Sequence, residues 1–231
     1  VATSGRAGPV LLDVPEDIAH GEYDFPEDDL YADMNAINAP AYRSRPAKDD
    51  LARAAGLLAK AKRPVILVGG GAHLSGAQAA LTAFAETFNI PVAHTLSGKG
   101  SIPCNHALAL GLFGRYSRIA NDIIESSDCI LVIGCKMGEV ATKRYTLPPR
   151  HIPLIHLEIQ AEEIGRCVAA DVPLWGDAKA GIEDLSAEMS DSAASQHTAR
   201  GEYAAEVTTR MTNWRMEVQE RLTSNEQPVK D

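Results

Sequence analysis

The stretch that decides the fold is Gly134–Gly165, GCKMGEVATKRYTLPPRHIPLIHLEIQAEEIG. It starts where one apolar run ends, and it contains a second apolar run, Leu154–Leu157, that stops at the acidic Glu158. Two earlier apolar runs also enter glycine-bearing turns, as PVILVGGG (Pro64–Gly71) and TLSGKG (Thr95–Gly100) show. Strands that end in this way are typical of an open parallel sheet, which binds nucleotides at the carboxyl ends of its strands.

Outward from this stretch, strand-like and helix-like segments alternate. The expected strands are Val65–Val68, Val92–Thr95, Cys129–Ile133, Leu154–Leu157 and an edge strand at Val168–Val172. The expected helices are one capped by Asp49 or Asp50 and others at Ser75–Phe88, Ser117–Ser126 and Ala178–Met189. This alternation predicts an α/β fold: a doubly wound, mainly parallel, Rossmann-like sheet with helices on both faces.

The two ends of the chain have a different pattern. Val10–Val14 (VLLDV) predicts a short buried strand, which cannot fold alone and needs an upstream or a following sheet. An acidic, proline-bearing linker then runs to about residue 46. Ser190–Thr198 is small and polar, which favours a hinge, and Ala199–Leu222 predicts a long helix before the linker-like SNEQPVKD. We therefore expect a piece of a longer protein in three parts: 1–46, 47–190 and 191–231.

Composition excludes several classes of partner. The 231 residues carry a net charge of −9, which disfavours nucleic acid and anionic membranes as partners. No apolar run approaches the ~20 residues of a membrane-spanning helix, and we expect a cytoplasmic protein. Cys104, Cys129, Cys135 and Cys167 show no CxxC spacing, which predicts free, buried thiols.

The chemistry-bearing residues suggest binding and no catalysis. Gly69–Gly71 follows a strand and precedes a helix, where it could approach a phosphate or serve only as a tight turn. The strict GxGxxG pattern fails at Leu74. Glu158 is placed to accept ribose hydroxyls or to act as a cap or surface carboxylate, and Asp177 is a ligand contact or a helix cap. No histidine shows metal-ligand spacing and no nucleophile–base pair is present, so we expect no catalytic residue and no metal ligand.

Several segments of the sequence resemble a known family of enzymes. The run Ala2–Val10 (ATSGRAGPV), continued by DVPEDI at Asp13–Ile18, looks like the end of the pyrimidine-binding domain of thiamine diphosphate-dependent enzymes. Other segments resemble the central domain of these enzymes, most closely of the acetolactate synthase large subunit: Pro64–Gly71, Ile90–Ala93, Gly98–Pro103, Leu110–Gly114 and Ile155–Gly165. The resemblance makes 1–46 the end of an upstream domain with its linker, 47–190 the central domain, and 191–231 a helix and linker to a diphosphate-binding domain.

In flavin-binding members the central domain holds FAD as a structural cofactor. Carried over motif by motif, the resemblance implies these cofactor-binding residues: Arg6, Gly69, Gly70, Gly71, Thr95, Leu96, Gly111, Leu112, Phe113, Gly134, Lys136, Glu158, Ile159, Gly176 and Asp177. This chain has Lys136-Met137-Gly138-Glu139 where those members carry arginine and then Phe-Asp-Asp. Lysine lacks the planar fork that binds phosphate bidentately. FAD, ADP and no nucleotide therefore all remain as alternatives.

The resemblance implies that the catalytic parts lie outside this chain. The activating glutamate belongs to the upstream domain, and the GDG…N segment that holds Mg²⁺ and thiamine diphosphate lies downstream; Gly176-Asp177-Ala178 lacks its third glycine. In the parent protein, thiamine diphosphate would stabilise a carbanion formed from a 2-oxo acid. We therefore expect an inactive piece of a homo-oligomeric lyase or carboligase, dimeric or tetrameric. The alternatives are a free-standing dinucleotide-binding module and, with less support, a dehydrogenase.

Overall fold

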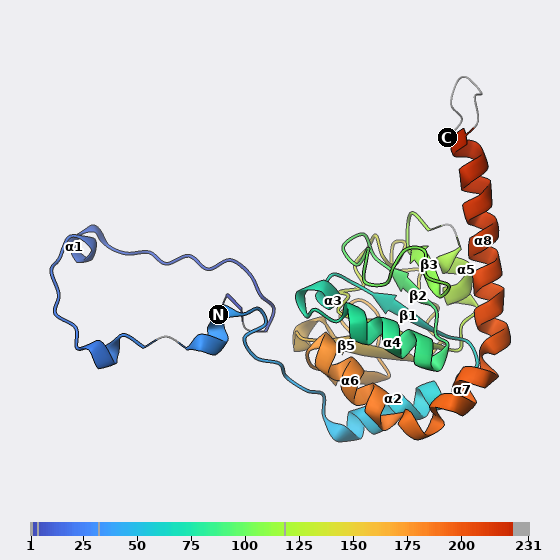
Figure 1. Ribbon diagram of the computed structural model, residues 1–231, viewed down its shortest axis with the longest axis horizontal. Coiled ribbons are helices and arrows are strands. Elements are labelled where there is room, and N and C mark those ends of the chain that lie inside the picture. Colours follow the sequence, from blue (N-terminus) through green and yellow to red (C-terminus); the bar gives the residue numbers. More distant parts are fainter. Residues whose placement is uncertain (1, 4, 32, 118, 224–231) are drawn as a thin grey trace.

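The computed structural model describes residues 2–3, 5–31, 33–117 and 119–223, and its centre is a six-stranded sheet in which every strand pair is parallel. The strands are β1 (Pro64–Val68), β2 (Val92–His94), β3 (Ala109–Leu112), β4 (Cys129–Ile133), β5 (Leu154–Glu158) and β6 (Val172–Trp175), in the order β3-β2-β1-β4-β5-β6 (Figure 1). The order reverses between β1 and β4, whose registered pairs include Val65 with Ile130. The predicted doubly wound α/β fold is confirmed.

The period-two pattern of the strands divides the core into two layers. In β1, Ile66 and Val68 belong to one buried cluster, and Val65 and Leu67 belong to the other. The first cluster is covered by α2 (Lys48–Lys60), α4 (Gln78–Phe88), α6 (Ala178–Glu188) and α7 (Ala193–Ala199), which lie together on one side of the sheet (Figure 1). The second is covered by α5 (Ala120–Glu125) and the first half of α8 (Gly201–Thr223). Strands buried on both faces explain the continuous apolar runs in the sequence.

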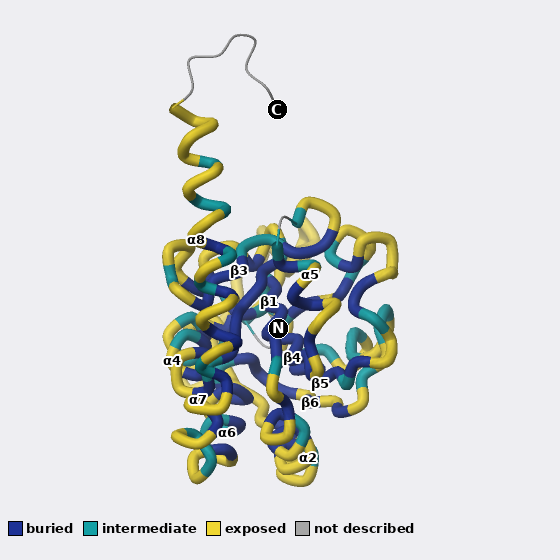
Figure 2. Tube along the Cα trace, turned by 90° about the vertical axis from the view of Figure 1, so that its right-hand side faces the viewer, coloured by how far each residue is buried: buried dark blue, intermediate teal, exposed yellow. Residues whose placement is uncertain are grey.

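The long C-terminal helix is anchored through its first turns. Tyr203, Val207 and Met211 of α8 are buried, as their spacing predicts. Just before the helix, Arg200 is only 1% exposed and donates hydrogen bonds to the carbonyl oxygens of Leu58, Ala61 and Phe88. The second half of α8 extends beyond the sheet and is mostly exposed (Figure 2).

The expected strand at Val10–Val14 is wrong. Residues 7–39 form an arm that leaves the sheet-containing body and returns to it (Figure 1), with a short helix α1 (Glu16–Ala19) and two 3₁₀ turns, η1 (Glu27–Asp29) and η2 (Met34–Ile37). Leu11 and Leu12 are 92% and 83% exposed. The segment stays irregular because no described strand of the sheet pairs with it.

Several element boundaries also differ from the expectation. The expected helix at Ser75–Phe88 starts later, as α4 at Gln78, because Gly76 has a φ of +64° and separates it from a preceding short helix, α3 (Gly71–Leu74). The edge strand starts later, at Val172, where Pro173 is tolerated because an edge strand has a free side. α2 begins after Ala47 with no side-chain cap, so neither Asp49 nor Asp50 caps it.

The expected hinge at Ser190–Thr198 is also wrong. This segment is helical, as η4 (Ser190–Ser192) and α7, because α7 packs against α4. β3 was not expected as a strand. SNEQPVKD lies outside the described residues.

Candidate functional site

A cavity of about 550 Å³ lies at the carboxyl ends of the strands, where the sheet order reverses. The turns after β1 and β4 form its middle, the segments after β2 and β3 form one end, and those after β5 and β6 form the other. A crevice at the reversal point of a doubly wound sheet is the usual ligand position in this architecture.

The structure brings nearly all of the predicted binding residues to this cavity. Those that line it are Arg6, Gly69, Gly70, Gly71, Thr95, Leu96, Leu112, Phe113, Gly134, Lys136, Glu158, Ile159, Gly176 and Asp177. Gly111 is the exception, since it lies within β3 and does not line the cavity. What these residues bind stays a prediction.

The glycines of the two central turns are required by packing of the protein on itself. A Cβ on Gly69 would lie 2.7 Å from the Cα of Cys135 and closer still to the carbonyl oxygen of Gly134. A Cβ on Gly71 would lie 2.7 Å from the Cα of Gly134, whose own φ is +53°. The tight-turn interpretation therefore accounts for these glycines, and the same close approach leaves their backbone facing the cavity.

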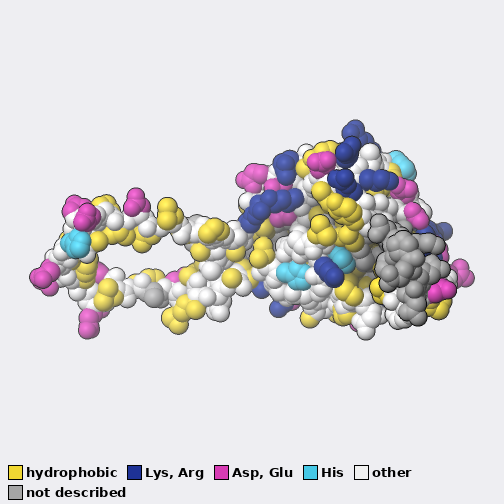
Figure 3. Space-filling view, turned by 90° about the horizontal axis from the view of Figure 1, so that it is seen from above, with side chains coloured by type: hydrophobic (Ala, Val, Ile, Leu, Met, Phe, Trp, Pro, Cys, Tyr) yellow, Lys and Arg dark blue, Asp and Glu magenta, His cyan; other side chains and the backbone are white. Residues whose placement is uncertain are grey.

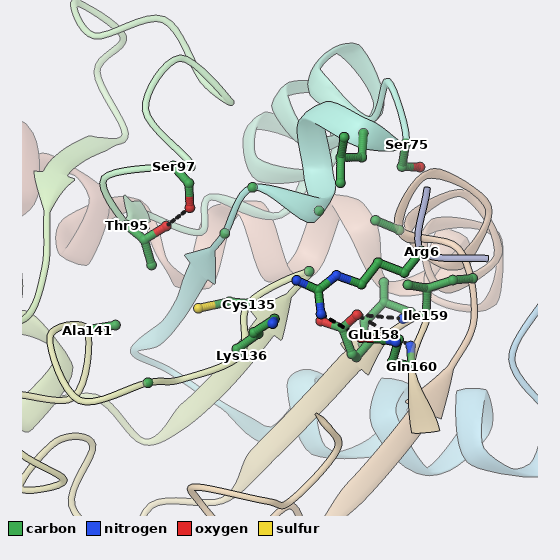
Figure 4. A pocket seen from close by; sticks show the side chains of 18 of the residues that line it. Arg6, Ser75, Thr95, Ser97, Cys135, Lys136, Ala141, Glu158, Ile159 and Gln160 are labelled. Atoms are coloured by element: carbon green, nitrogen blue, oxygen red, sulfur yellow. Dashed lines mark hydrogen bonds between the residues drawn. The ribbon is translucent and has the colours of Figure 1, made fainter. Parts of the chain in front are cut away.

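One end of the cavity is polar. Oε1 of Glu158 accepts hydrogen bonds from the backbone N–H groups of Ile159 (3.0 Å) and Gln160 (3.4 Å). Arg6 Nη1 donates to Gln160 Oε1 at 2.9 Å, which holds the guanidinium beside Glu158 (Figure 4). Glu158 is 7% exposed, and burial raises the pKa of its carboxyl group. The geometry offers a fixed carboxylate acceptor next to a cation.

Asp177 serves the protein as a helix cap. Its side chain accepts a hydrogen bond from the Ala180 N–H at the start of α6, and its Oδ1 lies 2.6 Å from Arg43 Nη1. Arg43 also donates to Ser75 Oγ at 2.9 Å. The cap interpretation is confirmed, and the carboxylate still lines the cavity.

Lys136 lies between the two ends of the cavity (Figure 4). Its Nζ is 3.5 Å from Glu163 Oε1, and Glu163 is also paired with Arg166 at 2.6 Å. The Lys136 side chain remains 46% exposed, which leaves its ammonium group accessible to an anionic ligand group, although the carboxylate of Glu139 lines the cavity close by.

The other end is apolar. Leu112 and Phe113 form its wall, and Leu96, Tyr116 and Val140 stand at its opening with exposed fractions of 65%, 57% and 45%. Apolar side chains on this face are visible among the basic ones in Figure 3. Tyr116 and Gln160 were missed from the sequence, although Tyr116 follows the recognised segment Leu110–Gly114 by two residues and Gln160 lies within the recognised segment Ile155–Gly165.

Within ranges 2–3, 5–31, 33–117 and 119–223, no three His, Cys, Asp or Glu side chains converge as a metal site. Burial lowers the pKa of His94 and of His156, so both are neutral at pH 7. The four cysteines are free as expected, but Cys104 is exposed, and burial raises the pKa of Cys135 to about 11. Over the same part of the chain, no helix has both the length and the apolar character of a membrane span.

A family model described as "Thiamine pyrophosphate enzyme, central domain" matches residues 51–185, which is more than half of the chain. The chain belongs to this family. The match runs from α2 to α6 and therefore includes all six strands of the sheet, whereas Arg6, the arm and α8 lie outside it.

Curated relatives agree with this thiamine pyrophosphate enzyme family. A "Probable acetolactate synthase large subunit" from Methanocaldococcus jannaschii is 40% identical over 194 residues, covering 82% of this chain and 32% of the relative. "Acetolactate synthase isozyme 3 large subunit" from Escherichia coli is 31% identical over 199 residues (85% and 34%). "Acetolactate synthase 3, chloroplastic" from Brassica napus is 35% identical over 191 residues (80% and 28%). The chain spans about a third of the length of these relatives.

Proposed function

We propose that this chain is the nucleotide-binding central domain of a thiamine diphosphate-dependent carboligase or decarboxylase acting on 2-oxo acids, as in acetolactate synthase. Membership of the central-domain family and the names of the relatives support the proposal. The chain itself supplies architecture and a nucleotide site and performs no catalysis alone. When bound in the parent, thiamine diphosphate with Mg²⁺ would supply the electron sink for the 2-oxo acid.

The observation that carries the nucleotide role is the cavity with the Glu158 carboxylate at one end and two glycine turns in its middle. Its volume of about 550 Å³ lies within the ~300–1,000 Å³ that is usual for ligand pockets. Glu158 would accept the ribose hydroxyls, and Arg6 and Lys136 would face the phosphates. The residues present fit an adenine nucleotide, FAD or ADP, although Lys136 holds phosphate less rigidly than an arginine would.

The arm supports the proposed assignment of residues 1–46 to the end of an upstream domain with its linker. Val10, Leu11 and Leu12 expose 58–92% of their surface, and the arm carries apolar and acidic side chains away from the body (Figure 3). Exposed apolar segments of this kind mark contact surfaces. In the parent they would be covered by the upstream pyrimidine-binding domain, within a cytoplasmic homo-oligomer.

A ligand panel tests this function. The midpoint of thermal unfolding of the 231-residue chain is measured alone and with FAD, ADP, NAD or Mg²⁺–thiamine diphosphate, because a ligand that binds only the folded state raises it. We expect FAD or ADP to raise the midpoint and thiamine diphosphate to leave it unchanged. No shift with either adenine nucleotide would refute the nucleotide role.

A second assay tests the absence of activity. Pyruvate is followed in the presence of the purified chain, Mg²⁺ and thiamine diphosphate, and we expect none to be consumed. Consumption proportional to the chain concentration would show that the catalytic parts lie within it.

A further inference from the structure

The two ends of the cavity are too far apart for a small nucleotide to contact both. Glu158 lies at the end of β5, and the apolar end is built at the ends of β2 and β3. In the order β3-β2-β1-β4-β5-β6, these ends are three and four strand spacings from β5, which is about 14–19 Å. A nucleotide held by its ribose at Glu158 places its diphosphate near the central glycine turns. The apolar end therefore lies where the second half of a dinucleotide would be.

Tyr116 is the exposed aromatic side chain at the opening of that end. It lines the cavity, yet 57% of its surface is exposed, and the guanidinium carbon of Arg115 lies 5.7 Å from its ring centroid. An aromatic ring exposed at a cavity mouth is an available stacking surface for a planar ligand ring. No ionised group of the cavity is needed for such a contact.

Tyr116 is carried by a loop that is fixed in place. The side chain of Asn121 accepts from the Gly114 N–H at 2.8 Å and donates to the Gly114 carbonyl oxygen at 2.9 Å. The Arg115 N–H donates to the carbonyl oxygen of Val140 at 2.9 Å, which joins this loop to the one after β4. Gly114 has a φ of +91°, and a Cβ there would overlap that same carbonyl oxygen. The loop therefore presents the ring from a defined position.

We propose that Tyr116 is a positioning residue that stacks on the second planar ring of a dinucleotide, and that it makes this cavity selective for a dinucleotide over a mononucleotide. This inference rests on the proposed nucleotide-binding function. It assigns a role to a residue of the β3–α5 loop, one that no sequence motif indicated.

The test compares dissociation constants for FAD, NAD and ADP by isothermal titration calorimetry. Tyr116→Ala is expected to weaken binding of the dinucleotide by about tenfold, the size of one aromatic stacking contact, and to change ADP binding less than twofold. Tyr116→Phe keeps the ring and should bind like the wild type. Tyr145→Ala is the matched control, because Tyr145 is also 57% exposed, lies in the neighbouring loop after β4 and does not line the cavity.

The possible outcomes distinguish the proposed role of Tyr116 from the proposed nucleotide-binding function. Equal dinucleotide binding by Tyr116→Ala and the wild type would overturn the role of Tyr116 while leaving the nucleotide function intact. Equal loss of dinucleotide and ADP binding would show that Tyr116 acts on the whole site and does not select for length. Failure of the wild type to bind any of the three nucleotides would refute the proposed function and this inference with it.

Discussion

Replacing the buried Arg200 tests how strongly the start of α8 is held to the carboxyl ends of α2 and α4. Its guanidinium donates to the carbonyl oxygen of Phe88 at 2.9 Å and to that of Ala61 at 3.1 and 3.2 Å, and it also contacts the Leu58 carbonyl. These oxygens lie at the carboxyl ends of α2 and α4, where the last helical carbonyls lack partners within the helix. One side chain therefore satisfies two helix ends and fixes the start of α8.

The magnitude follows from two opposing effects. Arg200→Met leaves the buried carbonyl groups of Ala61 and Phe88 without a donor, at ~1–3 kcal/mol each, whereas the Leu58 carbonyl keeps its hydrogen bond from the Ala61 N–H. Against this, burial lowers the pKa of Arg200 from 12.5 to about 10, which corresponds to a cost of about 3 kcal/mol for holding the charge in the core. The net loss in the free energy of unfolding is then about 1 kcal/mol, or roughly 2–4 °C in the unfolding midpoint for a chain of this size.

Urea unfolding followed by circular dichroism at pH 7 measures this loss. The control is Arg215→Met on α8, because Arg215 also donates to a backbone carbonyl, that of Cys104 at 2.8 Å, but this hydrogen bond is exposed and Arg215 is only half-buried. We expect it to cost ~0.5 kcal/mol or less. A gain in stability for Arg200→Met, or a loss no larger than that of the control, would refute the reasoning.

Three further predictions concern the cavity and the core. Gly69→Ala should destabilise the fold by ~1–3 kcal/mol, because its Cβ would collide with the turn at Gly134, whereas Gly56→Ala on the exposed face of α2 should be neutral or stabilising by up to ~1 kcal/mol; urea unfolding measures both. Burial raises the pKa of Glu158, so its ionised form costs stability at neutral pH, and this cost fades as the pH falls through that pKa. Glu158→Gln should therefore raise the unfolding midpoint at pH 7 and flatten the pH dependence of that midpoint between pH 7 and 4. A pH profile equal to that of the wild type would contradict this. The Tyr203 hydroxyl finds no hydrogen-bond partner among the described residues, so Tyr203→Phe should be neutral or slightly stabilising in thermal melts, and a loss above ~1 kcal/mol would reveal an interaction there.

The local hydrophobic pattern of the sequence was sufficient to predict most strands of the sheet. β1, β4 and β5 were predicted within one residue, because strands buried on both faces must be continuously apolar. β3 was missed because ALGL is short and contains Gly111, and it becomes a strand only by pairing with β2. Val10–Val14 was predicted as a strand and is not one, because an apolar run forms a strand only where a partner strand exists.

The candidate site, too, could be predicted only in part from the sequence. The family motifs correctly predicted that Glu158, Lys136 and the glycine turns lie together. Each lies at or just after the end of a strand, and the carboxyl ends of parallel strands meet at one edge of the sheet. Tyr116 lies outside the recognised motifs and reaches the cavity through loop geometry, whereas Gln160 lies within the recognised segment Ile155–Gly165 but was not singled out.

The sequence alone determined the fold class and the edge of the sheet where a ligand would bind, because hydrophobic periodicity and strand-end residues are local properties, and its motifs showed the resemblance to the family. Only the tertiary structure decided that the glycines are needed for contact between two turns, that Asp177 is occupied as a helix cap, and that Arg200 joins three distant carbonyl oxygens. Those facts depend on atoms that are far apart in the chain and meet only when the layers pack. The same packing separates the polar and apolar ends of the cavity, and that separation sets the size of the ligand we propose.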